Sequence, residues 1–128
     1  MLAMPELSLV PGAIVWADLD PVQGREQGGR CPMLVVSSDI HLELATRLVT
    51  VIPITSKNRQ WPNHIPISGD AGLGQESWAM TEQGRTISRE RISSRAGTLS
   101  AQSLADVRMW LGDFLGLSFS TELPHRTK

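Results

Sequence analysis

The chain has 128 residues, 41% of them hydrophobic, and a formal net charge of −1. Its length allows one domain whose core needs neither disulfides nor metal, and its single cysteine, Cys31, excludes an internal disulfide and a multi-cysteine zinc site. The first residues lack the basic start and apolar core of a signal peptide, and no apolar run approaches the roughly 20 residues of a membrane helix. We expect one cytoplasmic domain over residues 1–128, with 1–11 and 118–128 as tails.

The basic residues are mostly arginines and are unevenly spread. None precedes Arg25, and four of them gather between residues 85 and 95: Arg85, Arg89, Arg91 and Arg95. Arginine suits bidentate contacts with phosphate. A solvated surface that happens to use arginine explains the same pattern equally well, so charge alone does not decide between the two.

Two expected strands flank a loop rich in glycine. Residues 13–19 place apolar side chains on both faces of a strand that ends at Asp20–Pro21, since proline removes a ladder donor. Residues 33–36 form a continuous apolar run, typical of a strand buried on both faces. The loop between them, GREQGGRCP (24–32), carries cations, a carboxylate and an amide. Loops on a rigid scaffold often hold binding and catalytic groups.

The middle of the chain continues in strands and polar loops. LVTVIPIT (48–55) is the most β-branched stretch and predicts a strand, although Pro53 argues for an edge, a bulge or a strand end. Residues 40–46 are ambiguous and compatible with a short helical turn. The polar residues 56–63 and the glycines of 68–75 indicate two loops on either side of a short strand at 64–67.

Short strands are expected at 77–81 and 85–88, and 92–96 is less clear. A helix should then begin after Ser100, a good N-cap, and end at Gly116. Its apolar residues recur at helical spacing: Leu104, Val107, Leu111, Phe114 and Leu115. The pattern predicts a mostly β fold with a C-terminal helix: a compact antiparallel β barrel, against which, or against a neighbouring subunit, the helix packs.

Three polar stretches could form one site: the loop 24–32, the strand end Thr55–Ser56 and the segment 82–85. Around these residues the chain resembles a known family. The runs PGAIVWADLDPVQGREQGGRCPMLVVSSD, RLVTVIPIT and TEQGRTISRERISSRAGTLS are similar to the MazF/PemK family of toxin ribonucleases, which belong to type II toxin–antitoxin pairs. The resemblance covers nearly the whole chain, from about Pro11 through the C-terminal helix.

The resemblance implies a homodimer of SH3-like barrels of the MazF/PemK/CcdB type. It implies cleavage of single-stranded RNA, such as mRNA, at short sequence motifs without a metal or other cofactor. It also implies neutralisation by a cognate antitoxin that wraps the substrate groove. In the family, the ribose 2′-hydroxyl attacks the adjacent phosphate. Such a reaction needs a proton acceptor, a proton donor and donors that stabilise the charge of the phosphorane.

Most of the family's site residues have counterparts here. Glu26 and Gln27 match the loop motif G-x-E-Q, and Thr55 matches the threonine that helps bind and orient the scissile phosphate. Gln83 and Arg85 match the Q-x-R pair, which lines the groove and the dimer interface. We take Glu26, Arg30 and Thr55 as candidate catalytic residues. The candidate RNA-binding residues are Arg25, Gln27, Cys31, Ser56, Arg59, Trp61, Gln83 and Arg85.

Cys31 departs from the family pattern. The family usually has arginine immediately before the proline, as its main catalytic cation, whereas here the cation is one residue earlier, at Arg30. In an extended segment, Arg30 and Cys31 project to opposite sides. Three interpretations stay open: Arg30 or Arg25 reaches the groove, the protein binds RNA with weak or no cleavage, or the chain is a variant whose catalytic arginine was substituted. The alternative function is an RNA- or antitoxin-binding module, or an inhibitor of a protein target, as the related CcdB toxins are.

Structural roles compete with functional ones at several of these residues. Glu26 could serve only as an ion-pair partner of a neighbouring arginine, and Thr55 is a β-branched residue at a strand end. Trp61 could stack on a base or cover the end of the barrel. We expect His64, in the alternating sequence HIPI, to be a strand-surface histidine rather than a general base.

Overall fold

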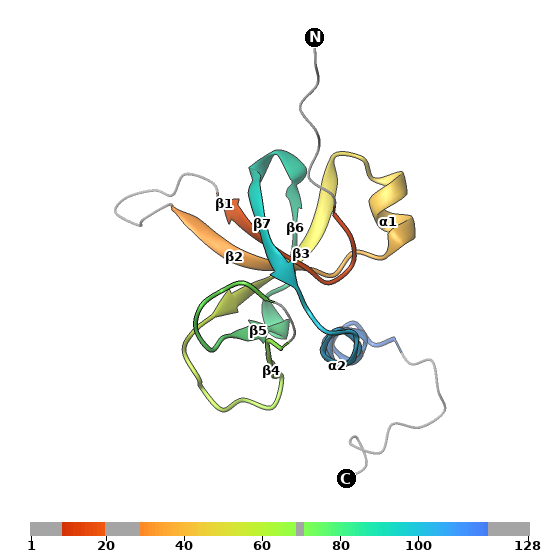
Figure 1. The fold of residues 1–128 in the computed structure, drawn as a ribbon. Helices are drawn as coiled ribbons and strands as arrows, with labels where there is room; N and C mark the ends of the chain where they lie inside the picture. Colours follow the sequence, from red (N-terminus) through yellow and green to blue (C-terminus); the bar gives the residue numbers. More distant parts are fainter. Residues whose placement is uncertain (1–8, 20–28, 69–70, 118–128) are drawn as a thin grey trace, which may run out of the picture.

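The computed structural model describes residues 9–19, 29–68 and 71–117. This part of the chain forms seven strands, two α helices and two short 3-10 turns (Figure 1). The elements in chain order are β1 (Ala13–Asp18), β2 (Arg30–Val35), α1 (Asp39–Leu44), β3 (Leu48–Thr55), β4 (His64–Pro66), β5 (Trp78–Met80), η1 (Thr81–Gln83), β6 (Arg85–Ser88), η2 (Arg89–Arg91), β7 (Ile92–Thr98) and α2 (Ala101–Phe114).

All strand pairings are antiparallel, in the order β4-β5-β3-β2-β1-β7, with β6 paired to β3 outside this path. The predicted class, mostly β with a C-terminal helix, is confirmed. The predicted barrel, however, does not close, because no pairing among the described residues joins β7 to β4 or β6.

Strand β3 has different neighbours at its two ends. Residues Leu48–Val51 pair with β6, and Ile54–Thr55 pair with β5. Pro53 lies between these two ladders, which explains why a residue without an N–H group is tolerated there. The strand continues past Pro53 to Thr55, so a strand end at the proline is wrong.

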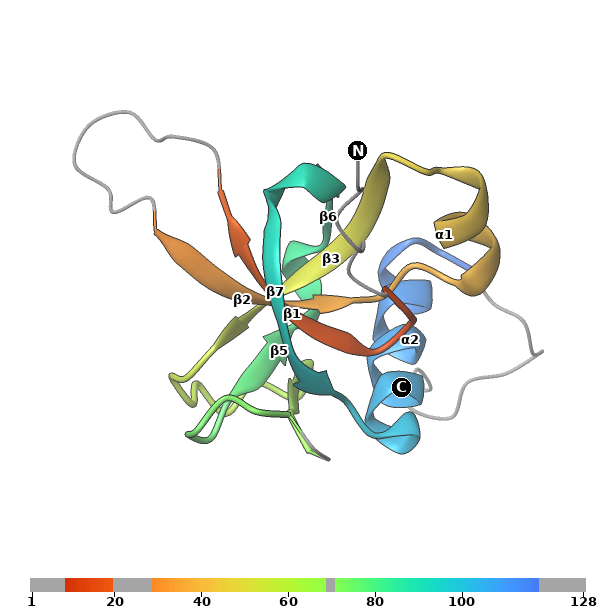
Figure 2. The same cartoon turned by 45° about the horizontal axis from the view of Figure 1, so that its top comes forward.

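Strands β2 and β3 separate at one end. Their pairing reaches only as far as Met33 and Pro53; from there β2 continues beside β1 to Arg30, and β3 continues beside β5 to Thr55. Figure 2 shows the two strands diverging from the crowded centre of the molecule. We call this divergence the fork.

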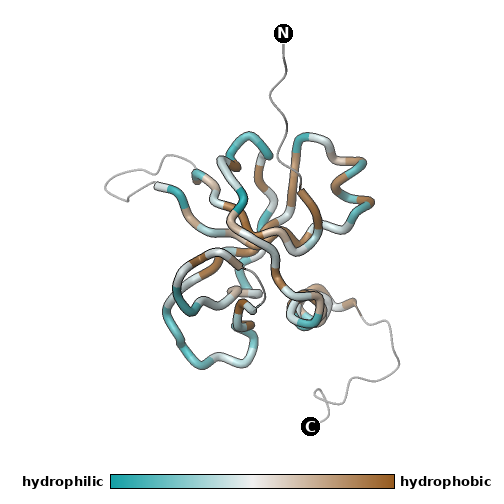
Figure 3. The backbone as a smooth tube through the Cα atoms, in the orientation of Figure 1, coloured by the Kyte–Doolittle hydropathy of each residue, from teal (hydrophilic) through white to brown (hydrophobic). Residues whose placement is uncertain are grey.

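The alternation of side chains along the strands builds a core on each side of the sheet. The first core cluster contains Val15 of β1, Met33 of β2 and Val51 of β3. The second contains their chain neighbours Ile14, Leu34 and Ile52, and also Val107 of α2. In Figure 3 the hydrophobic stretches converge on the centre of the molecule, where these strands cross. Helix α2 therefore covers the second cluster.

Helix α2 begins and ends as its sequence predicts. The Ser100 hydroxyl accepts a hydrogen bond from the Ser103 N–H (3.2 Å), and Gly116 adopts a φ of 77°, which favours glycine. The apolar stripe is only partly covered: Leu104 and Leu111 pack against the second cluster, whereas Phe114 and Leu115 are 50% and 71% exposed. In the described part of the chain, no helix is long and apolar enough to cross a membrane.

Three local predictions differ from the structure in their limits. Strand β2 begins at Arg30, earlier than the apolar run that predicted it, because it pairs with β1. The ambiguous residues after Ser38 form α1, whose first turn is capped by the Ser38 hydroxyl. The uncertain segment after η2 is the full strand β7, paired with β1.

Candidate functional site

The loop that carries most of the predicted chemistry lies largely outside the described residues. Arg25, Glu26 and Gln27 fall within 20–28, so their predicted roles stay predictions. The described part begins at Gly29 and contains Arg30 and Cys31, the first two residues of β2.

Arg30 and Cys31 lie on opposite faces of the sheet, as the extended backbone predicts. The guanidinium carbon of Arg30 lies 5.3 Å from the centroid of the Trp16 ring, a cation–π distance. Cys31 instead packs against the first core cluster, and its sulfur donates a weak hydrogen bond to the Gly29 carbonyl (3.8 Å). The two side chains are therefore not interchangeable in position.

A pocket of about 220 Å³ lies at the fork. Trp16 and Pro32 contribute one wall, and Thr55 and Ser56 the other. The remaining lining residues are Ile54, Leu73, Gln75 and Ser77. Because Arg30 lies over Trp16, the cation is next to the pocket that the predicted phosphate-binding threonine also lines.

Thr55 links this pocket to the neighbouring surface. It pairs with Trp78 of β5, and its hydroxyl accepts a hydrogen bond from the Lys57 N–H (3.1 Å), which turns the chain into the loop 56–63. Ala79 of β5 faces the second core cluster, so Trp78 and Met80 face the other way. Thr55, opposite Trp78 in the ladder, therefore lies on the same face of the sheet as Trp78 and Met80.

Three predicted RNA-binding residues meet around Met80, a residue that the sequence did not indicate. The Arg59 guanidinium and the Gln83 amide donate to the Met80 sulfur at 4.0 Å and 3.6 Å. The Arg59 guanidinium carbon also lies 6.0 Å from the ring centroid of Trp61, which is 48% exposed. We call Arg59, Trp61, Met80 and Gln83 the Met80 surface. A methionine in a short strand carries no signal that would have identified it.

A hydrogen-bonded carboxylate lies beside the Met80 surface. Both oxygens of Glu82 lie 3.1 Å from Nε2 of His64, and Asn63 donates to Oε1 at 2.7 Å. Partial burial raises the pKa of Glu82, but the hydrogen bond from His64, together with those from its own backbone and from Gln83, lowers it below its ordinary value overall. Glu82 is therefore a stable acceptor at neutral pH.

The prediction of a surface histidine at 64 is wrong. His64 is only 5% exposed, because the Trp61 ring covers it at a centroid distance of 4.7 Å and its Nε2 faces Glu82. Sequence alternation could not show this, since the covering tryptophan belongs to a loop and the carboxylate to a turn.

The arginines between residues 85 and 95 do not act as one charged patch. Arg89 donates to the carbonyls of Leu42, Ala45 and Leu48, so it secures α1 and the start of β3. Arg95 donates to Thr98 within its own strand. Arg85 is exposed and, with Arg91, lines a shallow polar pocket that also includes Leu19, the last described residue before residues 20–28.

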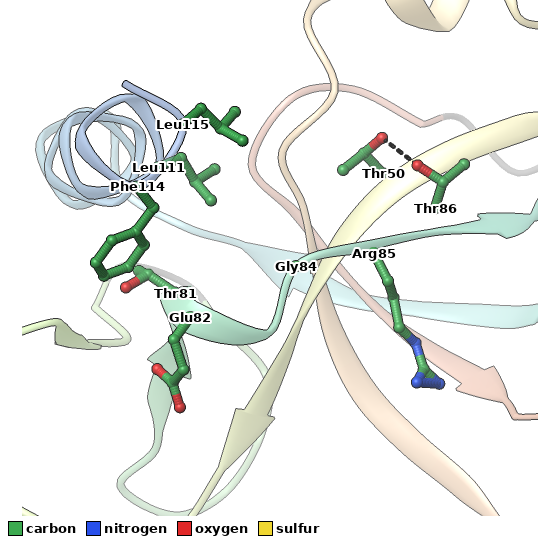
Figure 4. A pocket seen from close by; sticks show the side chains of 9 residues that line it. All are labelled: Thr50, Thr81, Glu82, Gly84, Arg85, Thr86, Leu111, Phe114 and Leu115. Carbon is green, nitrogen blue, oxygen red and sulfur yellow. Dashed lines mark hydrogen bonds between the residues drawn. The ribbon is translucent and has the colours of Figure 1, made fainter. Parts of the chain in front are cut away.

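An apolar pocket of about 380 Å³ lies between α2 and β6. Leu111, Phe114 and Leu115 line it from the helix, opposite Thr50 and Thr86, whose hydroxyls are hydrogen-bonded at 2.9 Å. Figure 4 shows the Glu82 and Arg85 side chains directed away from Leu111 and Leu115. Glu82 and Arg85 also line this pocket, so its apolar helix side adjoins the polar groups of the segment 82–86.

No group of three or more His, Cys, Asp or Glu side chains in the described ranges is arranged to hold a metal ion. The chemistry that this part of the chain offers consists of the Arg30 guanidinium, the Thr55 hydroxyl and the polar groups of the Met80 surface.

Comparison with known proteins identifies the family. The family model described as "PemK-like, MazF-like toxin of type II toxin-antitoxin system" matches residues 11–115. The chain belongs to this toxin family. Among its curated PemK/MazF relatives, it is 37% identical over 102 residues to endoribonuclease MazF9 of Mycobacterium tuberculosis, covering 75% of this chain and 86% of that protein. It is 33% identical over 98 residues to endoribonuclease EndoA of Bacillus subtilis, covering 75% and 84%.

Solved MazF structures share the fold. The chain matches MazF of Deinococcus radiodurans (Form-I) with a TM-score of 0.69 at 31% identity, covering 85% of this chain and 97% of that one. It matches a MazE–MazF structure of the same organism (Form-II) with a TM-score of 0.73 at 29% identity, covering 86% and 97%. These MazF matches agree with the mostly β class seen here.

Proposed function

We propose that this protein is the toxin of a type II toxin–antitoxin pair and a metal-independent endoribonuclease that cleaves single-stranded RNA, such as mRNA. The observation that supports it best is the fork, where the Arg30–Trp16 pair and the Thr55 strand end flank one pocket. Relatives that cover most of this chain are named endoribonucleases. RNA as substrate and a lone cysteine both fit a cytoplasmic, single-domain protein.

In the proposed mechanism, the ribose 2′-oxygen attacks the adjacent phosphorus. A 2′-O–P bond forms and the P–O5′ bond breaks, and the departing 5′-oxygen takes a proton from water, which leaves a cyclic phosphate and a free 5′-hydroxyl. The Arg30 guanidinium stabilises the extra negative charge of the phosphorane, because a cation next to the phosphate opposes that charge. The Thr55 hydroxyl orients the phosphate, and Glu26 is the candidate that accepts the 2′-hydroxyl proton.

Incubation of the pure protein with mixed single-stranded RNA in EDTA tests this proposal. We expect discrete fragments that end in cyclic phosphate. The variant Arg30→Ala, prepared in the same way, controls for contaminating nucleases and should yield far fewer fragments. Intact RNA at high concentrations of the wild-type protein would contradict the proposal.

A weak or inactive nuclease that binds RNA or its antitoxin is the second candidate, and Cys31 favours it. The thiol occupies the position of the family's arginine and packs against the first core cluster, so it supplies no fixed positive charge to the pocket. The variant Cys31→Arg separates the two. Cleavage that is weak in the wild type and strong in the variant supports the second candidate, whereas strong cleavage in both supports Arg30 or Arg25 as the cation.

We also propose that the protein forms a homodimer and binds a cognate antitoxin over the RNA groove. The exposed end of α2 supports the dimer, because Phe114 and Leu115 border an apolar pocket. The variant Leu115→Asp should shift the mass measured by light scattering toward the monomer. Leu44→Asp is a matched control, since Leu44 is 77% exposed on α1 and does not line that pocket. Equal masses for the two variants would contradict this interface.

A further inference from the structure

The amide of Gln83 is oriented by its neighbours. Its Nε2 donates to Oε2 of Glu82 (3.2 Å) and to the sulfur of Met80 (3.6 Å). Both partners are acceptors, so the reverse orientation would place the amide oxygen against a carboxylate. No described residue donates to the other end of the amide, its carbonyl oxygen.

Glu82 in turn is fixed by groups that are themselves buried or bonded. Nε2 of His64 lies between its two oxygens, and His64 is held under the Trp61 ring. Asn63 donates to Glu82 and also contacts the buried Thr81, whose hydroxyl donates to the Asn63 carbonyl (2.7 Å). This arrangement ties the loop 56–63 to η1 and leaves the carboxylate little freedom to rotate.

We infer that Glu82, held by His64 and Asn63, is a positioning residue that fixes Gln83 with its carbonyl oxygen outward, so that the Met80 surface selects bases bearing an exocyclic amino group over uracil. The inference rests on the proposed RNA binding. An outward carbonyl accepts a hydrogen bond from the amino group of cytosine or adenine. Uracil is a poorer donor to the Gln83 carbonyl oxygen, because its single N–H lies between two carbonyl oxygens, which the amide oxygen repels.

Cytosine and uracil provide a matched pair for the test, because they have the same ring size and differ mainly in the amino or carbonyl group at one position. The probes are fluorescein-labelled 2′-O-methyl oligocytidine and oligouridine, and fluorescence anisotropy gives the two dissociation constants. The wild type should prefer oligocytidine by roughly two- to tenfold, the range of one net hydrogen bond. Because these probes lack the attacking hydroxyl, the result is independent of whether the protein cleaves RNA.

Glu82→Gln preserves the shape of the side chain but can present either an amide oxygen or an amide nitrogen to Gln83. In this variant, we expect the ratio of the oligouridine to the oligocytidine dissociation constant to fall toward one. Glu43→Gln, an exposed control on α1, should keep the wild-type ratio. Gln83→Met should abolish the preference, and adding Glu82→Gln to it should change the ratio no further. If Glu82 had only a structural role, Glu82→Gln would weaken the binding of both probes by the same factor.

Three results would overturn the inference: a wild type that binds both probes equally or not at all, a Glu82→Gln variant with the wild-type ratio, or an unchanged ratio in Gln83→Met. The last variant alters an exposed side chain and remains informative if Glu82→Gln does not fold. Cleavage of mixed RNA by the wild type would still support the proposed function in each of these cases.

Discussion

The two sides of the candidate RNA site are held in different ways. On β2, the Arg30 side chain has a single contact with an aromatic ring, that of Trp16. On η1, Glu82 and Gln83 are joined to each other and to His64, Asn63 and Met80 by hydrogen bonds. Under the proposed function, we infer from this difference that the Met80 surface is organised before RNA binds, whereas the Arg30 guanidinium takes its final position against the bound phosphate.

This comparison predicts two kinds of mutational effect. A change on the β2 side should lower the rate of the chemical step, because its cation meets charge that develops in the transition state. A change on the Met80 surface should weaken binding, because its contacts exist equally in the ground state. The following experiments test this division, beginning with the largest expected effect.

Arg30→Ala should reduce kcat by roughly 100-fold or more, the usual effect of losing a group that stabilises transition-state charge. KM should change little. Steady-state cleavage of a short fluorogenic RNA measures both constants. Cys31→Ser is the matched neighbour and should retain activity, since its sulfur makes only a weak hydrogen bond to Gly29. A larger loss in Cys31→Ser than in Arg30→Ala would reverse the assignment.

Thr55→Val should lower kcat by about tenfold or more, because it removes a hydroxyl that can bond to a charged phosphate. The same assay measures it. Thr55→Ser keeps the hydroxyl and should restore most of the rate. Because serine keeps the hydroxyl, a failure to rescue would assign the effect to the methyl group of Thr55 rather than to a phosphate contact.

Trp61→Ala should raise KM about fivefold or more without a comparable change in kcat, as expected for the loss of one base-stacking contact. Binding of 2′-O-methyl RNA should weaken by the same factor. Trp61→Phe keeps an aromatic face over His64, so its KM should lie between those of the wild type and Trp61→Ala. An effect confined to kcat would instead show that Trp61 acts on the chemical step, as Arg30 of β2 is proposed to do.

The smallest expected effect is the acid sensitivity of the network around Glu82. Its pKa is lower in the folded protein than its ordinary value of about 4.5, so its stabilising contribution is present above that value and disappears as pH falls through the folded pKa. The difference in Tm between wild type and Glu82→Gln should therefore shrink as the solution is acidified below about pH 4.5. Thermal unfolding followed by circular dichroism tests this, and a difference that grows in acid would contradict it.

The strands and the helix could be predicted because their signals are local. Alternation along β1, the β-branched run of β3 and the caps of α2 each depend on neighbouring residues only. The same local logic correctly placed Arg30 and Cys31 on opposite faces. The class of fold follows from such elements. Whether the sheet closes into a barrel depends instead on which strands pair, and local sequence patterns do not specify that.

The cluster of Met80, Glu82 and His64 could not be predicted in the same way. Met80, Glu82 and His64 come together only because β4 pairs with β5 and η1 folds back beside them. Arg89 shows the same limit, since its place in an arginine-rich segment left phosphate binding and a solvated surface equally open, whereas its guanidinium donates to backbone carbonyls. Tertiary contacts thus decide both cases.

The pairing of β1 with β7 joins the first and the last strand of the described chain. During synthesis, β1 emerges from the ribosome long before β7, so the sheet cannot be completed until β7 has been made. Contacts between such distant segments also make folding slow. A chain cut short before β7 should therefore fail to fold stably, and a protein that acts on mRNA would acquire its activity only after β7 has emerged from the ribosome.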